Sequence, residues 1–227
     1  MQILERLTRE AGREYALRNL KSNIISLDLL PGSMVSENEI ATLLGVSRTP
    51  VREALVELSY VGMVAIYPQK GSAITLIDEA LVEQSTFMRI ALECTVVEYC
   101  CDRATELDIE RLREHIKLQE FHLQSKFFLG DPHELDNGFH KLLFDIAKQP
   151  LVFDMMRRMA IHMDRLRTLT FDDIPRLAVC EEHAVLVDVI ESRDKDRARE
   201  MMKTHITRYQ SILDKLRGQH KEYFKHP

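Results

Sequence analysis

Four ionisable side chains in the second half of the chain have the types and spacing of metal ligands. Asp136 and His140 are four residues apart, so on a helix they lie side by side on one face. His183 and His205 each share a helical stripe with apolar residues and are expected to face a core. Three histidines and one aspartate from three helices predict a divalent metal site, with one or two positions left for water or effector oxygens. Zn is the preferred ion, and Ni and Mn are alternatives.

Two other interpretations of these side chains stay open. A single histidine on an apolar face is commonly a hydrogen-bonded core residue rather than a ligand. His162 is a rival ligand, because it shares a stripe with four apolar residues. These are Met155, Met159, Leu166 and Leu169.

The elements that would position these ligands are helices. Beyond Asp78, glycine and proline become sparse and apolar residues recur at helical spacing. We expect an antiparallel bundle with room for a cavity between facing helices. Its predicted helices span residues 78–103, 107–129, 132–148, 150–170, 174–192 and 194–217.

The first part of the chain has shorter elements separated by turn residues. An amphipathic helix containing Leu17 to Leu27 should end before Pro31-Gly32, followed by an extended stretch at residues 34–35. Ser36 with Glu39 forms a capping-box pattern that opens a second helix. Gly45 ends that helix, since glycine readily adopts the left-handed conformation of a tight turn.

A third helix follows this turn at once, with Ser47 as its cap and Pro50 in its first turn. Its apolar residues define an inward face, which leaves Arg48, Thr49 and Arg52 outside. This order, a helix, a tight turn and a second helix with cationic N-terminal residues, is that of a helix-turn-helix. The second helix of such a motif fits the major groove of DNA. Arginine can contact guanine O6 and N7 together, and the hydroxyls of Ser47 and Thr49 suit phosphates or base edges.

The segment after Gly62 alternates apolar residues around a turn at residues 68–71, as a two-stranded hairpin would. This hairpin is expected to be the wing of a winged helix-turn-helix, with Lys70 at its tip placed for a phosphate or minor-groove contact. The simpler alternative for the third helix is a capped surface helix whose arginines face solvent.

Charge and composition limit the other possibilities. The net charge is −5, and residues 1–75 hold eight basic and eight acidic side chains, so only a few placed cations can contact DNA. No run of about 18 apolar residues and no signal-peptide pattern occur, so we expect a cytoplasmic protein without a membrane partner. The four cysteines lie in apolar helical contexts and are expected to be buried and reduced.

Residues 12–75 resemble the DNA-binding domain of the GntR superfamily. The stretch "LPGSMVSENEIATLLGVSRTPVREALVELSYVGMV" carries the resemblance, together with the wing glycine, Gly71. The resemblance implies that Arg48, Thr49 and Arg52 contact operator DNA and that Gly71 lies at the wing tip. Asn38 departs from the pattern, because some relatives have a DNA-contacting arginine there.

Residues 82–213 resemble the FCD effector domain of the FadR subfamily. The matching segments are "MRIALE", "DNGFH", "EEHAVLVDVI" and "SRDKDRAREMMKTHI". The resemblance implies that Asp136, His140, His183 and His205 bind the metal and that Arg89 binds an effector carboxylate, for which a guanidinium is well matched. The alternative for Arg89 is a helical ion pair with Glu93 and no ligand role. The sequence "AKQP" at residues 147–150 departs from the family pattern.

Together these features predict a mainly α-helical, non-enzymatic transcription regulator. Residues 1–76 would form the winged helix-turn-helix domain, and residues 77–227 the FCD-type effector-binding and dimerisation domain. A homodimer would bind palindromic double-stranded operator DNA as a repressor. A small organic-acid effector at the metal would change the fit of the two winged domains to their half-sites. A metal-responsive regulator and a helical-bundle metalloenzyme are the alternatives.

Overall fold

The computed structural model describes residues 1–124, 132–170 and 173–225. The chain divides into two compact units. Unit 1 contains residues 1–82, 161–168 and 216–227, and unit 2 contains residues 83–160 and 169–215. No helix of the described residues is both long and apolar enough to cross a bilayer.

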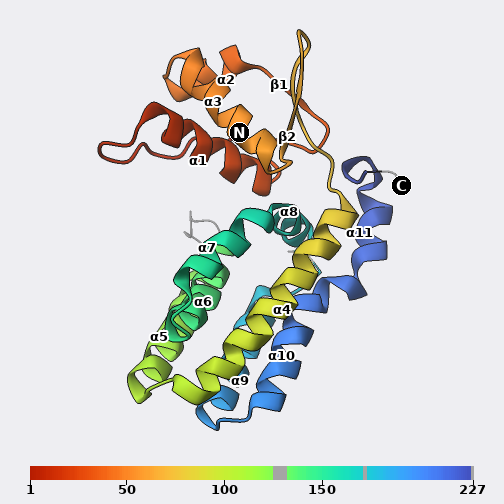
Figure 1. The fold of residues 1–227 in the computed structure, drawn as a ribbon. Coiled ribbons are helices and arrows are strands. Elements are labelled where there is room, and N and C mark those ends of the chain that lie inside the picture. The colour runs from red at the N-terminus through yellow and green to blue at the C-terminus, as the bar shows by residue number, and fades with distance from the viewer. Residues whose placement is uncertain (125–131, 171–172, 226–227) are drawn as a thin grey trace. The chain divides into compact units, whose positions relative to one another are not determined.

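Unit 1 is built around three helices and a small sheet. The helices are α1 (Gly12–Ile25), α2 (Glu37–Leu44) and α3 (Arg48–Tyr60). The strands are β1 (Met34–Val35), β2 (Val64–Tyr67) and β3 (Gly71–Ile74), and they pair antiparallel in the order β1-β3-β2. Figure 1 shows the β2–β3 hairpin extending beside the three helices. The predicted winged helix-turn-helix is confirmed.

Local sequence signals account for the helix boundaries in this unit. The Ser36 side chain accepts a hydrogen bond from the Glu39 backbone nitrogen at 3.4 Å and caps α2. Gly45 ends α2 with a φ of 64°, the left-handed conformation that glycine adopts without steric cost. At the wing turn the Lys70 backbone nitrogen donates to the Tyr67 carbonyl at 3.0 Å.

The core of unit 1 lies mainly between α1 and α3. Leu20 and Ile24 of α1 and Leu55 and Leu58 of α3 are almost completely buried. Burying such a side chain stabilises the fold by roughly 1.5–3 kcal/mol. The turn of the helix-turn-helix is therefore fixed by packing as well as by capping.

The buried face of α1 also contains two asparagines that the apolar pattern did not predict. Asn19 and Asn23 are fully buried, and their side-chain oxygens accept hydrogen bonds from the backbone nitrogens of Leu4 and Gln2 at 2.9 and 2.5 Å. Paired buried amides of this kind avoid the cost of an unsatisfied polar group. They hold the N-terminal segment along α1.

Unit 1 is completed by two stretches from late in the sequence. One is most of α8 (Ile161–Leu169), whose Ile161 belongs to the same core as α1 and α3. The other contains the short helix η2 (Lys221–Tyr223) and Phe224, which forms an isolated parallel bridge with Ile77. Helix α11 (Leu213–Gln219) leads into this second stretch.

Unit 2 is a helical bundle. Its helices are most of α4 (Glu79–Arg103), α5 (Glu106–Gln124), α6 (Pro132–Ile146), α7 (Pro150–Met159), α9 (Arg176–Glu191) and α10 (Lys195–Thr207), followed by η1 (Arg208–Ser211). Within the bundle α9 packs against both α5 and α10, and α6 packs against α5 (Figure 1). The predicted helical architecture is confirmed.

Two of the six predicted helices are wrong in their continuity. The helix expected over residues 150–170 is broken at Ala160, and the one expected over 194–217 is interrupted by η1. Met155 and Met159 are 62% and 57% exposed, so they do not form a buried stripe with His162. The end of the helix predicted over residues 107–129 lies outside the described residues.

The cysteines agree with the sequence-based prediction. Cys94, Cys100, Cys101 and Cys180 are all free and buried. Burial raises the pKa of the Cys100 thiol to about 12 and that of Cys180 to about 11.

Candidate metal centre and nucleic-acid interface

The four predicted metal ligands come together inside unit 2. Asp136 and His140 lie on α6, His183 on α9 and His205 on α10, and one ligand atom from each lies within 4.8 Å of the others. Asp136 Oδ2 is 3.7 Å from His140 Nε2, and its Oδ1 is 3.7 Å from His183 Nε2. The i, i+4 spacing on α6 therefore places the two α6 residues on one side of the cluster.

Each imidazole has an acceptor next to its other ring nitrogen. His140 Nδ1 lies 2.5 Å from Glu93 Oε2, His183 Nδ1 lies 3.2 Å from Gln119 Oε1, and His205 Nδ1 lies 2.9 Å from Glu182 Oε2. An oxygen acceptor at Nδ1 favours the tautomer with the proton on Nδ1. This leaves the lone pair on Nε2, the atom that faces the cluster, and a metal-binding histidine needs this arrangement.

The surroundings of the three Nε2 atoms favour a cation. His140 Nε2 and His205 Nε2 are 3.2 Å apart, so in these tautomers two lone pairs face each other. His183 Nε2 is buried and has no hydrogen-bond partner among the described residues. A cation between these nitrogens would accept all three lone pairs, so the residues fit a divalent metal ion held by three nitrogens and one carboxylate.

Burial controls the charge of the cluster. It lowers the pKa of His140 and of His183, so both imidazoles are neutral near pH 7. Burial alone would raise the pKa of Glu93, but the positive charge of Arg89 and the contact with His140 outweigh it and hold that pKa well below its usual range. Glu93 is therefore a carboxylate, as its role beside His140 requires.

Arg89 lies at the edge of this cluster. Its Nε donates to Glu93 Oε1 at 2.6 Å, and its terminal nitrogen NH2 is 3.5 Å from His140 Nε2. The side chain is only 8% exposed. The helical ion pair with Glu93, considered above as the alternative role, is present, and the same pair places a guanidinium beside the candidate metal ligands.

His162 is not part of the cluster. It belongs to unit 1, where the Arg165 guanidinium donates to its Nδ1 at 2.6 Å. The pattern that suggested it as a rival ligand assumed an unbroken helix, and the break at Ala160 separates His162 from the two methionines of that pattern.

Sequence reasoning missed the roles of three residues that contact the imidazoles. Glu93 entered only as the ion-pair partner of Arg89, and Glu182 was given no part in orienting a ligand. Gln119 was not singled out at all. A buried glutamine within α5 could have been noticed from its neighbours Leu112 and Ile116, which lie on the same helical face and are buried.

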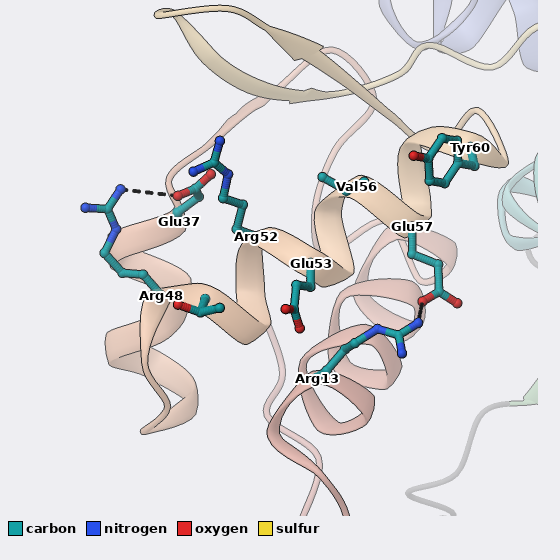
Figure 2. Close-up of a pocket in the computed structure, with 9 residues that line it drawn as sticks. Arg13, Glu37, Arg48, Arg52, Glu53, Val56, Glu57 and Tyr60 are labelled. Atoms are coloured by element: carbon teal, nitrogen blue, oxygen red, sulfur yellow. Dashed lines mark hydrogen bonds and ion pairs between the residues drawn. The ribbon is translucent and has the colours of Figure 1, made fainter.

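The predicted DNA-contacting residues lie on one surface of unit 1. Ser47, Arg48, Thr49 and Arg52 are all exposed on the first turns of α3. Figure 2 shows the Arg48 and Arg52 side chains projecting from α3. The Ser47 side chain makes no capping hydrogen bond, although the residue occupies the N-cap position. This part of α3 therefore remains exposed within unit 1.

Acidic residues share this surface. Arg48 forms an ion pair with Glu37 of α2 at 3.2 Å, and Arg13 of α1 pairs with Glu57 (Figure 2). The outer face of α3 lines an open groove together with Arg13 and Glu37. The positive charge on this face is thus limited to a few guanidinium groups, as the composition predicted.

The wing continues the same surface. A second hollow is lined by the N-terminal end of α2, by Arg48 and by Lys70 and Gly71 of the hairpin. Arg48 lines both this hollow and the α3 groove. Gly71 has a φ of 101°, a conformation that other residues rarely adopt, and it allows the chain to leave the turn and enter β3.

Comparisons with known proteins agree with this architecture. Residues 14–74 match the model of the bacterial regulatory proteins of the gntR family, and residues 84–208 match the FCD domain. The chain therefore belongs to the GntR family of bacterial transcription regulators and carries an FCD domain.

Individual relatives cover nearly the whole chain. It is 31% identical over 208 residues to the HTH-type transcriptional repressor RspR of Escherichia coli K12, and the match covers 91% of each chain. It is 30% identical over 207 residues to an HTH-type transcriptional regulator of Streptomyces ambofaciens, covering 90% of this chain and 86% of that protein. The solved structure of E. coli McbR/YncC shares the fold, with a TM-score of 0.73 at 20% identity over 92% of this chain and 99% of that chain.

Proposed function

We propose that the protein is a repressor whose affinity for operator DNA is controlled by a small carboxylate bound at a metal ion in unit 2. The observation that supports the regulatory part best is the convergence of three imidazole Nε2 atoms and the Asp136 carboxylate. The function of residues 1–76 is then DNA binding, and that of residues 77–227 is effector binding and dimerisation.

The DNA-binding part rests on the exposed first turns of α3. Arg48 and Arg52 would read base edges in the major groove, where a guanidinium can contact guanine O6 and N7 together. The hydroxyls of Ser47 and Thr49, and Lys70 beside Gly71 on the wing, would contact phosphates or the minor groove. A homodimer would place two such surfaces on the half-sites of a palindrome. The name of the relative RspR supports the repressor role.

The sensing part rests on the chemistry of the ligand set. Asp136, His140, His183 and His205 would hold Zn, with Ni or Mn as alternatives. When bound, the ion supplies a Lewis-acidic position for a carboxylate oxygen. Arg89 lies next to this position and would contact the effector carboxylate, since guanidinium and carboxylate are well matched. The effector must bind one arrangement of the dimer better than another to change operator affinity.

The DNA-binding proposal is tested with duplexes selected by the full-length protein from a random pool. Fluorescence anisotropy on the best duplex should show that Arg52→Ala loses about 1–3 kcal/mol of binding free energy, roughly 5- to 150-fold in affinity. Arg111→Ala, which removes an exposed arginine of α5, is the matched control and should bind like the wild type. Equal binding by Arg52→Ala and the wild type would contradict the role of α3.

The sensing proposal is tested by titrating Zn²⁺ and small carboxylic acids separately and together against the same duplex. A change in affinity that needs both the ion and an acid supports the proposal. A change produced by the ion alone would replace it with a metal-responsive regulator. No response to a broad panel of acids in the presence of Zn²⁺ would contradict the effector role.

A further inference from the structure

Gln119 of α5 connects two of the helices that carry the candidate metal ligands. The residue is only 3% exposed. Its Nε2 donates to the Leu135 carbonyl of α6 at 2.6 Å, and its Oε1 lies 3.2 Å from His183 Nδ1 of α9. The amide thus has a partner at each end.

The orientation of this amide follows from hydrogen-bond chemistry. A backbone carbonyl can only accept hydrogen bonds, so the nitrogen of the Gln119 amide must face Leu135. The amide oxygen then faces α9, and an amide oxygen can also only accept. His183 Nδ1 must therefore be the donor.

This assignment fixes the chemical state of His183. With its proton on Nδ1, the neutral imidazole keeps its lone pair on Nε2, which points toward Asp136. The ring plane is fixed as well, because Phe139 stacks on it with centroids 3.9 Å apart and an interplanar angle of 12°. Both the atom and the direction of ligation are thus determined before any ion binds.

The other end of Gln119 acts on a second ligand. Leu135 immediately precedes Asp136, so the hydrogen bond to its carbonyl holds the backbone beside the ligand carboxylate. His115, one turn earlier on α5, contacts the same carbonyl through Nε2 at 2.8 Å. A Cβ atom on Gly138 would lie 2.7 Å from His115, so a glycine at this position lets α5 approach α6 this closely.

We propose that Gln119 is the positioning residue of the metal centre, with one amide orienting both His183 and Asp136 for ligation. The inference rests on the metal site proposed above and extends it to a residue that does not touch the ion. Outer hydrogen-bond partners of this kind typically contribute tenfold to 100-fold to metal affinity. Gln119 differs from Glu93 and Glu182 because it is uncharged, so it orients its imidazole without adding negative charge.

The test is the affinity of the full-length protein for Zn²⁺, measured by competition with a chromophoric chelator. Gln119→Met keeps the length of the side chain and removes both hydrogen bonds, and it should weaken binding about tenfold to 100-fold. Gln84→Met, on the exposed face of α4, is the matched control and should bind within twofold of the wild type. Binding by Gln119→Met within twofold of the wild type would overturn the proposal.

A second variant separates this inference from the metal site itself. His183→Ala should lose high-affinity Zn²⁺ binding, and unchanged binding would contradict the metal site. Loss in His183→Ala together with retention in Gln119→Met would contradict only the role of Gln119.

A spectroscopic measurement on the unmodified protein does not depend on whether Gln119→Met folds. Long-range ¹H–¹⁵N correlation spectra of the metal-free protein should show His183 protonated on Nδ1 and unprotonated on Nε2, with the assignment made by comparison with His183→Ala. Protonation of His183 on Nε2 would overturn the proposal, because Nδ1 would then have no proton to donate to the amide oxygen of Gln119.

Discussion

Arg165 donates a hydrogen bond to the backbone carbonyl of Thr75 at 2.5 Å, although the two residues are 90 positions apart in the sequence. The guanidinium also donates to the Leu76 carbonyl at 3.3 Å, and the residue is completely buried. Burial lowers its pKa to about 10, which still leaves it charged at pH 7. A helix from late in the chain thus holds the segment that follows the wing.

Replacing Arg165 with methionine should destabilise the protein. The substitution removes the donors of two backbone carbonyls, and an unsatisfied buried acceptor costs about 1–3 kcal/mol. We expect a loss of about 2–4 kcal/mol in the free energy of unfolding, measured by urea denaturation followed by circular dichroism. Arg158→Met changes an exposed arginine of α7 and should stay within about 0.5 kcal/mol of the wild type. A similar small change in Arg165→Met would show that these hydrogen bonds add little.

His162 should make stability depend on pH. Its Nδ1 accepts a hydrogen bond from Arg165, so the ring is neutral in the folded protein. Burial, with a smaller effect of the Arg165 charge, lowers the pKa of His162 to about 4, while Asp78 and Lys225 act weakly in opposite directions. The unfolded chain therefore binds the additional proton first, and stability should fall as the pH drops from about 6.5 toward 4.

The lowered pKa of His162 corresponds to a loss of about 3 kcal/mol in the free energy of unfolding at the acid end of that range. Urea denaturation of the wild type and of His162→Gln at several pH values measures it, and the variant should lose less stability between pH 6.5 and 4. If both proteins show the same pH dependence, the titration belongs to another group.

Glu37 should weaken DNA binding by competing for Arg48. The ion pair is exposed, and such pairs contribute up to about 1 kcal/mol. Glu37→Gln removes both this competitor and a negative charge from the proposed DNA-binding surface. We expect about twofold to fivefold tighter binding to a random duplex at low salt. Glu106→Gln makes the same change in net charge on an exposed position of α5, so an equal gain there would assign the effect to overall charge.

The four cysteines should be unreactive in the folded protein. All are buried and free, and burial raises the pKa of each thiol, so the nucleophilic thiolate is scarce. Ellman's reagent at pH 8 should detect four thiols per chain in guanidinium chloride and almost none under native conditions. Rapid labelling of the native protein would show that the bundle opens readily.

The predictions from sequence succeeded where the signals are local. The cap at Ser36, the left-handed Gly45 and the apolar spacing of α3 each depend on a few neighbouring residues, and together they define the winged helix-turn-helix. The i, i+4 spacing of Asp136 and His140 likewise placed both side chains on one face of α6.

The predictions failed where distant segments decide the structure. Neither proline nor glycine marks the break at Ala160, where the chain passes from one core, which includes Met156, to another, which includes Ile161. Gln119 and Glu182 acquire their roles only when α5, α9 and α10 pack together, so no spacing within one helix could reveal them.

Unit 1 is built from three separate stretches of the chain, and this limits how domains can be exchanged between regulators of this kind. In a chimera with a single junction near residue 76, the winged domain comes from one protein. The residues at the positions of Arg165 and Phe224 then come from the other protein. The carbonyls of Thr75 and Leu76 and the bridge at Ile77 would then depend on residues selected for a different partner. An exchange of operator specificity should therefore transfer residues 161–168 and 216–225 together with the N-terminal segment. Such a chimera contains three transferred segments instead of one.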